Sequence, residues 1–368
     1  MCYTEVDALL KYAQGTFKQK EIEERRLLEE VVIKGGEFGL IKRIREQMGS
    51  KIGDDAAILQ PPKGKLLASI DMLVEGIHFE KSYITPWQLG WKALAVNISD
   101  IAAMGGTPLY ALVSLGLSHD IDDAYVDEIY QGLAAVASRF GVKVVGGDIV
   151  KSPGPLVVDV AILGESDHPV TRSGARPGDL IGVTGYLGSS AAGLAWLQSQ
   201  ARPARPSPIG SPTPVSTPPW AQELVRAHLE PIPRVEEGRQ LAATGAVSAM
   251  MDISDGLASE INHIAEEGQV GAILYGEDVP ISQATLAAAE ALGADPLSWA
   301  LFGGEDYQLV FTFAPEARAC ISKALKRLES RFWVVGKILP QEQGIRLVRR
   351  DGSAEQLLPQ GYNHFRSD

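Results

Sequence analysis

The chain has 368 residues, of which 45% are hydrophobic and 22% charged, and its formal net charge is −12. This length suits two domains of ordinary size, and the composition is typical of a globular protein. The acidic balance disfavours nucleic acid as a partner, because no broad basic surface would neutralise its phosphates. With only Cys2 and Cys320, the chain has no zinc ribbon, C-x-x-C redox motif or disulfide scaffold. Residues 1–26 lack the apolar core of a signal peptide and no apolar run could span a membrane, so we expect a cytoplasmic protein without membrane partners.

Strands and helices are predicted to alternate along the first half of the chain, which is an α/β pattern. Residues 1–34 are charged with apolar residues at roughly helical spacing, and predict a short helical extension. A first domain is expected over 35–170. Its predicted elements are strand 65–71, helix 87–104, strand 109–117, helix 124–140, strand 142–145 and strand 156–163.

The second half, 171–368, predicts a second α/β domain. Residues 199–220 are rich in proline and serine, which support neither a helix nor a central strand, so we interpret them as an exposed insertion. Short strands and turns are expected from 333 onward. The other predicted elements are strand 180–183, helices 188–198, 221–228 and 235–244, strand 250–252 and strand 307–313.

Six short segments, which we interpret as acidic turns, each combine an acidic residue with glycine or a small polar neighbour. Mg²⁺ prefers oxygen ligands and often takes one or two carboxylates per ion, so several ions need several carboxylates. Acids at strand ends converge on one edge of a sheet, and glycine beside them lets a phosphate approach the backbone amides. Asp and Gly are also common in ordinary turns, so the pattern alone leaves both a metal or phosphate site and ordinary turns open, although six such segments are hard to dismiss. They are 53–57, 69–71, 97–100 (within a predicted helix), 146–148, 252–256 and 303–306.

Other nucleotide-binding signatures are absent from the sequence. There is no G-x-x-x-x-G-K-[ST] loop, no protein-kinase catalytic loop and no nucleophile elbow. The spaced glycines of 182–188 precede a predicted helix, but no acidic residue closes a following strand at the distance that dinucleotide binding needs. We interpret this segment as a strand-to-helix turn.

Eight motifs occur in an order that resembles the thiamine-monophosphate kinase family. The resemblance spans about 35–365 and leaves out the N-terminal extension and the insertion. The motifs are GEF (36–38), IGDDAA (52–57), DMLVEGIHF (71–79), KALAVNISDIAAMG (92–105), GGD (146–148), TRSGARPG (171–178), DISDGL (252–257) and GGEDY (303–307).

The resemblance implies a two-domain α/β (α+β) fold like that of aminoimidazole ribonucleotide synthetase. In that fold the N-terminal domain binds ATP and Mg²⁺ and its sheet pairs across a homodimer. The implied reaction converts ATP and thiamine monophosphate into ADP and thiamine diphosphate. Matching motifs imply that Mg²⁺ is bound by Asp55 (with Asp54 beside it), Asp71, Asp100, Asp148, Asp252 and Asp255. They imply ATP contacts from Ser69, Tyr130, Gly147, Arg172 and Ser254, and thiamine monophosphate contacts from His78, Glu305 and Tyr362.

The expected mechanism is a direct in-line transfer without a covalent enzyme intermediate. The nucleophile is already an anionic phosphate oxygen, so catalysis rests on positioning and on charge stabilisation, here by Asp55, Asp148, Asp252 and Arg172. One departure from the family pattern is Ile70, where threonine is common, so a hydroxyl contact is lost there.

Two alternatives stay open at this point. One is an enzyme of the same fold with another acceptor, although Cys2 lacks the glycine-rich setting that selenophosphate synthetase would need. The other is a nucleotide-binding protein without turnover. The six acidic segments disfavour this second reading, because a mere binder needs fewer metal ligands.

Overall fold

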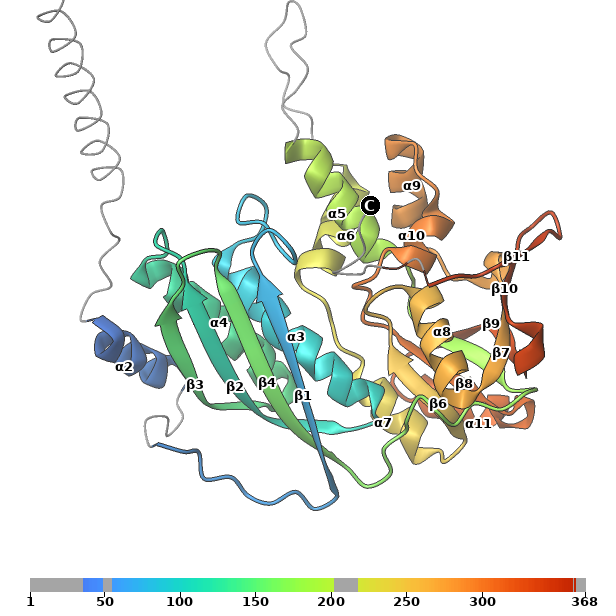
Figure 1. Cartoon of the computed structure of the whole chain (residues 1–368), viewed down its shortest axis with the longest axis horizontal. Coiled ribbons are helices and arrows are strands. Elements are labelled where there is room, and N and C mark those ends of the chain that lie inside the picture. The colour runs from blue at the N-terminus through green and yellow to red at the C-terminus, as the bar shows by residue number, and fades with distance from the viewer. Residues whose placement is uncertain (1–35, 49–54, 202–217, 360, 362–368) are drawn as a thin grey trace, which may run out of the picture.

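The computed structural model describes residues 36–48, 55–201, 218–359 and 361 (Figure 1). The expected N-terminal extension, Asp54 and Tyr362 lie outside the described residues. The described residues form two α/β units, each built on its own sheet, as the sequence predicted. The elements of 36–166 are called the N-terminal layer and those of 180–356 the C-terminal layer.

The N-terminal sheet has four strands in the order β1-β4-β2-β3, with β4 antiparallel to both of its neighbours and β2 parallel to β3. Helices α3 and α4 pack side by side on one face of this sheet (Figure 1). The capping box between Thr85 and Gln88 starts α3, and Asp122 caps α4. The elements are α2 (Gly36–Met48), β1 (Lys65–Val74), α3 (Pro86–Ala103), β2 (Thr107–Leu117), α4 (Asp123–Phe140), β3 (Lys143–Lys151) and β4 (Val157–Ser166).

The C-terminal sheet has seven strands in the order β11-β10-β7-β9-β5-β8-β6, and only β10 and β7 pair in parallel. Alternate residues of β8 face opposite sides. Val310 packs toward α8, whereas Phe311 and Phe313 pack toward α7 and α11. The strands are β5 (Leu180–Thr184), β6 (Val247–Asp252), β7 (Val270–Tyr275), β8 (Leu309–Phe313), β9 (Phe332–Pro340), β10 (Ile345–Val348) and β11 (Ala354–Gln356). The helices are α5 (Ser189–Ala201), α6 (Pro219–Leu229), α7 (Val235–Ala243), α8 (Leu257–Gly268), α9 (Gln283–Leu292), α10 (Pro296–Phe302) and α11 (Arg318–Lys326), with short 3₁₀ turns at Gly276–Asp278, Pro315–Ala317 and Gln341–Gln343.

Helix α3 joins the two layers. It is buried on nearly all sides, because one side covers the N-terminal sheet and the other meets the C-terminal half. Trp91 Nε1 donates to Pro231 O over 2.9 Å, and Gln88 Nε2 donates to Glu230 Oε1 over 2.9 Å. Residues on this helix can therefore meet residues of the other layer.

Two of the six acidic segments are not turns, contrary to the prediction. Asp71 lies inside β1, which keeps pairing with β4 as far as Val74, and 146–148 lies inside β3, which pairs with β2 as far as Lys151. At Gly147 a Cβ atom would come within 1.8 Å of Val113 O, so glycine permits the close approach of β2.

The expected insertion is shorter than predicted at both ends. Helix α5 continues to Ala201, and α6 already begins at Pro219, where proline suits the first helical turn. Residues 202–217 lie outside the described part of the chain.

Candidate functional site

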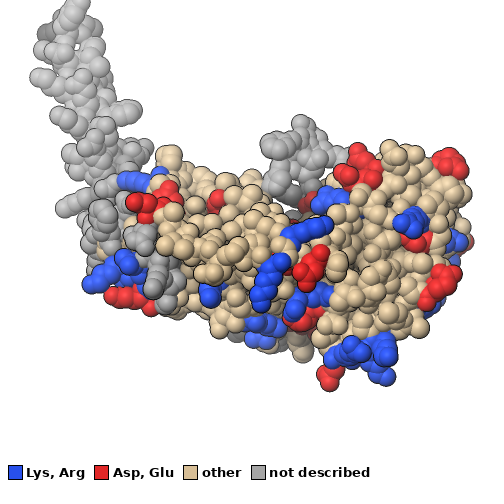
Figure 2. Space-filling model, turned by 90° about the horizontal axis from the view of Figure 1, so that it is seen from below, with Lys and Arg blue, Asp and Glu red and all other residues tan. Residues whose placement is uncertain are grey.

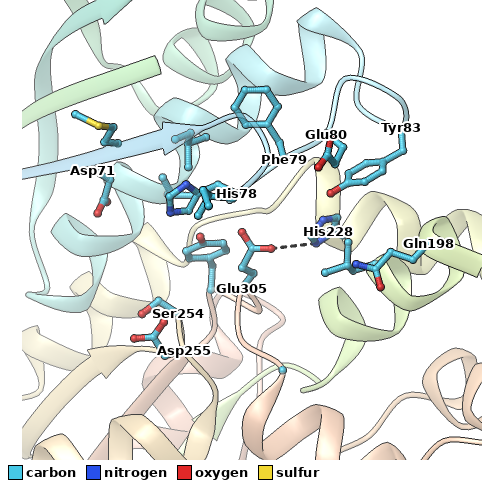
Figure 3. Close-up of a pocket in the computed structure, with 18 of the residues that line it drawn as sticks. Asp71, His78, Phe79, Glu80, Tyr83, Gln198, His228, Ser254, Asp255 and Glu305 are labelled. Atoms are coloured by element: carbon cyan, nitrogen blue, oxygen red, sulfur yellow. Dashed lines mark ion pairs between the residues drawn. The ribbon is translucent and has the colours of Figure 1, made fainter. Parts of the chain in front are cut away.

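A cleft of about 810 Å³ opens between the two layers (Figure 3). Its walls come from β1, the segment 76–83, α3, α5, α6 and the segments that follow β6 and α10. Seven of the residues predicted for the site share the cleft. They are Asp71, His78, Asp100, Asp252, Ser254, Asp255 and Glu305.

Four aspartates form one side of this cleft. Asp71 comes from β1, Asp100 from α3, Asp252 from the end of β6, and Asp255 from the segment after it. Ser69 donates to Asp100 Oδ2, so this predicted ATP contact lies beside the cluster. Ser99 Oγ donates to Asp252 Oδ2 over 2.5 Å. The strand, the helix and the loop thus bring together carboxylates that are far apart in the sequence.

Burial and mutual repulsion disfavour the charged forms of these carboxylates. Burial, followed by the charge of Asp100, raises the pKa of Asp71 to about 7 and that of Asp252 to about 7. Burial also raises the pKa of Asp100, against hydrogen bonds from Ser69 and Asp71 and the positive charge of Arg172, which act in the opposite direction. Among the described residues, the charge of Arg172 therefore offsets burial only in part.

The oxygen donors of this cluster fit a hard divalent cation. Among residues 36–48, 55–201, 218–359 and 361, no group of three or more His, Cys, Asp or Glu side chains is arranged to enclose a metal ion. Mg²⁺ rarely needs such a cage, because it usually binds one or two carboxylates and completes its shell with water and substrate phosphates. An open acidic wall suits that mode of binding.

The two C-terminal motif segments are fixed against each other. The Glu260 carboxylate on α8 accepts from the Ser254 N–H over 2.9 Å and from the Asp255 N–H over 2.7 Å. The Glu305 N–H donates to Ser254 O over 2.6 Å. Gly304 has φ +68°, and a Cβ atom there would lie 2.5 Å from Ser254 O. The backbone of both segments is thus held before any ligand binds, which is a requirement of precise positioning.

The segment that carries His78 is also anchored. His78 Nδ1 accepts from the Val74 N–H over 3.0 Å, so the proton of a neutral ring is on Nε2. Lys81 Nζ pairs with Glu75 Oε1 at 2.9 Å and with Asp120 Oδ2 at 2.6 Å, which ties the segment to the loop between β2 and α4. His78 therefore enters the cleft from a braced loop.

Glu305 has two partners that the sequence analysis did not single out. Lys92 Nζ lies 2.8 Å from Glu305 Oε1. His228 Nδ1 lies 3.1 Å from Glu305 Oε2, the ion pair drawn in Figure 3. Burial alone would raise the pKa of Glu305, but Lys92 and His228 outweigh it and lower that pKa to about 2. Lys92 stands in the predicted motif 92–105, and its position in an otherwise apolar helical stretch was a usable signal. His228 lies in an ordinary amphipathic helix and gave none.

The remaining predicted residues do not line the cleft of a single chain. Asp55 is exposed, and Asp148 and Gly147 lie on β3, at the opposite edge of the sheet from β1. Tyr130 is buried in the N-terminal core, at 3% exposure, away from the cleft. Arg172 is exposed near the cluster, and its charge acts on Asp100.

The surface shows no extended basic patch on the described part of the face in Figure 2, where Lys and Arg are interspersed with Asp and Glu. None of the described helices is both long and apolar enough to cross a membrane.

This two-layer fold with an acidic interlayer cleft defines a class of proteins. Residues 53–166 match the family model "AIR synthase related protein, N-terminal domain", and residues 176–348 match "AIR synthase related protein, C-terminal domain".

Individual relatives show which family within this class of proteins the chain resembles. The thiamine-monophosphate kinase of Aquifex aeolicus (strain VF5) is 40% identical over 282 residues, which cover 76% of this chain and 87% of the relative. The solved structure of AaThiL complexed with AMPPCP and TMP superposes with a TM-score of 0.71 at 36% identity, covering 90% of this chain and 97% of that one. The thiamine-monophosphate kinase of Stenotrophomonas maltophilia K279a gives a TM-score of 0.72 at 33% identity, covering 87% and 98%. The chain belongs to the thiamine-monophosphate kinase family.

Proposed function

We propose that this protein transfers the γ-phosphate of ATP to thiamine monophosphate, giving ADP and thiamine diphosphate. The observation that carries the proposal is the cleft itself, in which four aspartates lie together with His78 and Glu305. Acidic side chains that suit metal-bound phosphates thus share one cavity with groups that suit a cationic, amine-bearing acceptor. The relative solved with AMPPCP and TMP supports the same pair of substrates.

The aspartates would hold Mg²⁺ beside the triphosphate. Bound there, Mg²⁺ would neutralise phosphate charge. Asp71, Asp100, Asp252 and Asp255 meet in the cleft, and Ser69 and Ser99 fix two of these carboxylates by hydrogen bonds. The exposed Arg172 would approach an ATP phosphate with its planar guanidinium, and Ser254 would contact ATP from the segment that Glu260 holds.

His78 and Glu305 would contact thiamine monophosphate. Glu305 is held as an anion by Lys92 and His228, so it can only accept hydrogen bonds, and it would accept one from the amino group of the pyrimidine. A neutral His78 with its proton on Nε2 would donate to a phosphate or ring acceptor. The attacking phosphate oxygen is already anionic, so no general base is required, and the role of the residues is alignment. Tyr362 is proposed to join this part of the site.

We propose that the protein is cytoplasmic and forms a homodimer that pairs through the N-terminal sheet. Alternate residues of β1 expose large apolar side chains on the face opposite α3, and Leu66, Ile70 and Met72 are 58%, 61% and 51% exposed. Leu112 on β2 and Val150 on β3 are also exposed. A second copy of the chain would bury these residues. Ile70 thus fits an interface role better than a lost ATP contact.

Asp55, Asp148, Gly147 and Tyr130 are retained as proposed metal and ATP contacts on the strength of the motifs. In one chain they lie apart from the cleft, so the roles proposed for Asp55 and Asp148 require either a rearranged segment or a partner subunit. Tyr130 would have to leave a packed core position to contact ATP.

The test is an assay of the purified protein with ATP, Mg²⁺ and thiamine monophosphate, with thiamine diphosphate read by chromatography. Asp255→Asn and Asp55→Asn are assayed beside the wild type, with exposed Asp278→Asn as the control. Product from the wild type and control, and at least a tenfold loss in Asp255→Asn, supports the proposal. ATP binding without any product would overturn the kinase assignment.

A further inference from the structure

Lys92 is a buried cation whose only charged partner among the described residues is Glu305. Its side chain has 0% exposure, and Nζ lies 2.8 Å from Glu305 Oε1. Lys92 belongs to α3 of the N-terminal layer, whereas Glu305 belongs to the segment between α10 and β8 of the C-terminal layer. A fully buried lysine is retained only when it is paired, because desolvation strongly disfavours an isolated charge.

His228 holds the other oxygen of the same carboxylate. The ring is 2% exposed on α6, and Nδ1 lies 3.1 Å from Glu305 Oε2 and 3.0 Å from Ser190 Oγ. Burial and the charge of Lys92 lower the pKa of His228, so the ring is neutral at pH 7 and donates its Nδ1 proton to the carboxylate. The Glu305 carboxylate is therefore fixed at both oxygens.

The backbone of Glu305 is fixed as well. Its φ is +56°, an uncommon conformation for a residue with a side chain, and its N–H donates to Ser254 O over 2.6 Å. The side chain still has 26% exposure and lines the cleft. A carboxylate can accept about four hydrogen bonds. The Glu305 carboxylate can therefore accept a hydrogen bond from a ligand in addition to those from Lys92 and His228.

We propose that Lys92 and His228 are positioning residues that hold the Glu305 carboxylate as an oriented anion, which then accepts a hydrogen bond from the amino group of a cationic heteroaromatic acceptor. This inference deepens the proposed function and rests on it. Neither positioning residue needs to touch the acceptor. Both act through Glu305, and they do so from two different layers of the fold.

The first experiment separates the two substrates kinetically. Lys92→Met keeps the length of the side chain and removes its charge. The expected result is a rise of tenfold or more in KM for thiamine monophosphate, with KM for ATP changed by less than twofold. Isothermal calorimetry with thiamine monophosphate alone is expected to show the same loss. Arg239→Met, which removes an exposed ion pair with Glu236, is the control and leaves both constants unchanged.

His228 provides a second pair of variants in case Lys92→Met does not fold, as judged by circular dichroism. His228→Asn retains an N–H donor near the position of Nδ1, whereas His228→Leu removes it. We expect the asparagine variant to retain most of the affinity for thiamine monophosphate and the leucine variant to lose it. Equal affinities in the two variants would contradict the proposal.

A double-mutant cycle decides whether the residues act through Glu305. In a Glu305→Gln background, adding Lys92→Met or His228→Leu is expected to raise KM for thiamine monophosphate by less than a further twofold. If each still costs tenfold, the two residues have an independent structural role and the proposal fails. A wild type that forms no thiamine diphosphate would instead refute the proposed function. A wild type that turns over, with variants that bind thiamine monophosphate normally, would refute the positioning role alone.

Discussion

Ser99 Oγ on α3 donates a hydrogen bond to Asp252 Oδ2 at the end of β6, over 2.5 Å. This bond joins the two layers inside the acidic cluster. It orients one carboxylate without neutralising it, because a hydroxyl carries no charge. The cluster is therefore ordered but remains electrostatically unfavourable in the absence of a bound cation.

Asp252→Asn is expected to lower kcat about 100-fold or more, on the scale of losing one preorganised charge-stabilising group. It should also raise the melting temperature of the ligand-free protein, since a buried carboxylate near Asp71 and Asp100 disappears. Turnover assays and calorimetric unfolding without Mg²⁺ or nucleotide measure the two effects. A variant that is both inactive and less stable would show that Asp252 is mainly structural.

Glu260 is expected to support the nucleotide side of the cleft through its acceptor oxygen. Glu260→Ala leaves the Ser254 and Asp255 N–H groups without their carboxylate acceptor, which costs about 1–3 kcal/mol of stability and should raise KM for ATP. Glu260→Gln keeps an acceptor oxygen and is the matched control. Denaturant unfolding and ATP titration should rank the wild type and Glu260→Gln together above Glu260→Ala. Equal losses in both variants would assign the effect to the charge.

Gly304→Ala tests whether close packing of the two motif segments matters. Gly304 and Gly293 have nearly the same φ, +68° and +65°, but of these two only Gly304 would place a Cβ atom against another atom, Ser254 O at 2.5 Å. Gly293→Ala should therefore cost only the left-handed conformation, about 1–2 kcal/mol. Gly304→Ala should cost more and should also lower activity. Similar unfolding free energies for the two variants would contradict this account.

The contribution of His228 to stability should depend on pH. Burial and Lys92 lower its pKa in the folded state below the usual 6.5, so the unfolded chain binds the proton more readily. The groups around the ring are Glu305, Lys92, Ser190 and Tyr83. The stabilisation from a neutral His228 is present above pH 6.5 and is lost as the pH falls below it.

The measurement is the difference in unfolding free energy between the wild type and His228→Asn. This difference should shrink between pH 7 and pH 5. Subtracting the unfolding free energy of the variant cancels the contribution of acids that titrate elsewhere in both proteins. One of these acids is Glu260, whose pKa is raised by burial to about 8. A constant difference would show that His228 does not titrate differently in the two states.

Ile70→Lys is expected to disrupt the proposed dimer. The side chain is 61% exposed on the open face of β1, where a charge would be buried without a partner. Leu286→Lys, on the distant α9 at 39% exposure, is the control. Light scattering should give a dimer for the wild type and the control, and a monomer for Ile70→Lys. A monomeric wild type would refute the dimer.

The elements of the fold were predictable where local signals were strong. The α3 helix is bounded by Thr85-Pro86 at its start and Gly105-Gly106 after its end, and strand β1 was visible from Lys65. The strand ends were less predictable. Gly146 and Gly147 read as a turn, but pairing with β2 continues through them because glycine is required by the approach of Val113, not by a change of direction.

The site was predictable where chemistry is concentrated in a short motif, as at Asp252–Asp255 and Glu305. Apart from Lys92, which lies in a recognised motif, residues that act by supporting others were not visible in the sequence. Glu260 and His228 stand on amphipathic helices among ordinary neighbours, and their partners lie 5 to 77 positions away in the chain. No local pattern encodes such a contact, because it arises only when the layers pack.

The contacts made by α3 have a consequence for how this chain can vary in evolution. Gln88, Trp91, Lys92 and Ser99 each meet a group of the other layer. A chimera that combined the first half of this chain with the second half of a distant relative would need complementary residues at all of these contacts at once. Substitutions on this helix and on its partner segments are therefore expected to covary among homologues, and the two halves should be inherited as a matched pair.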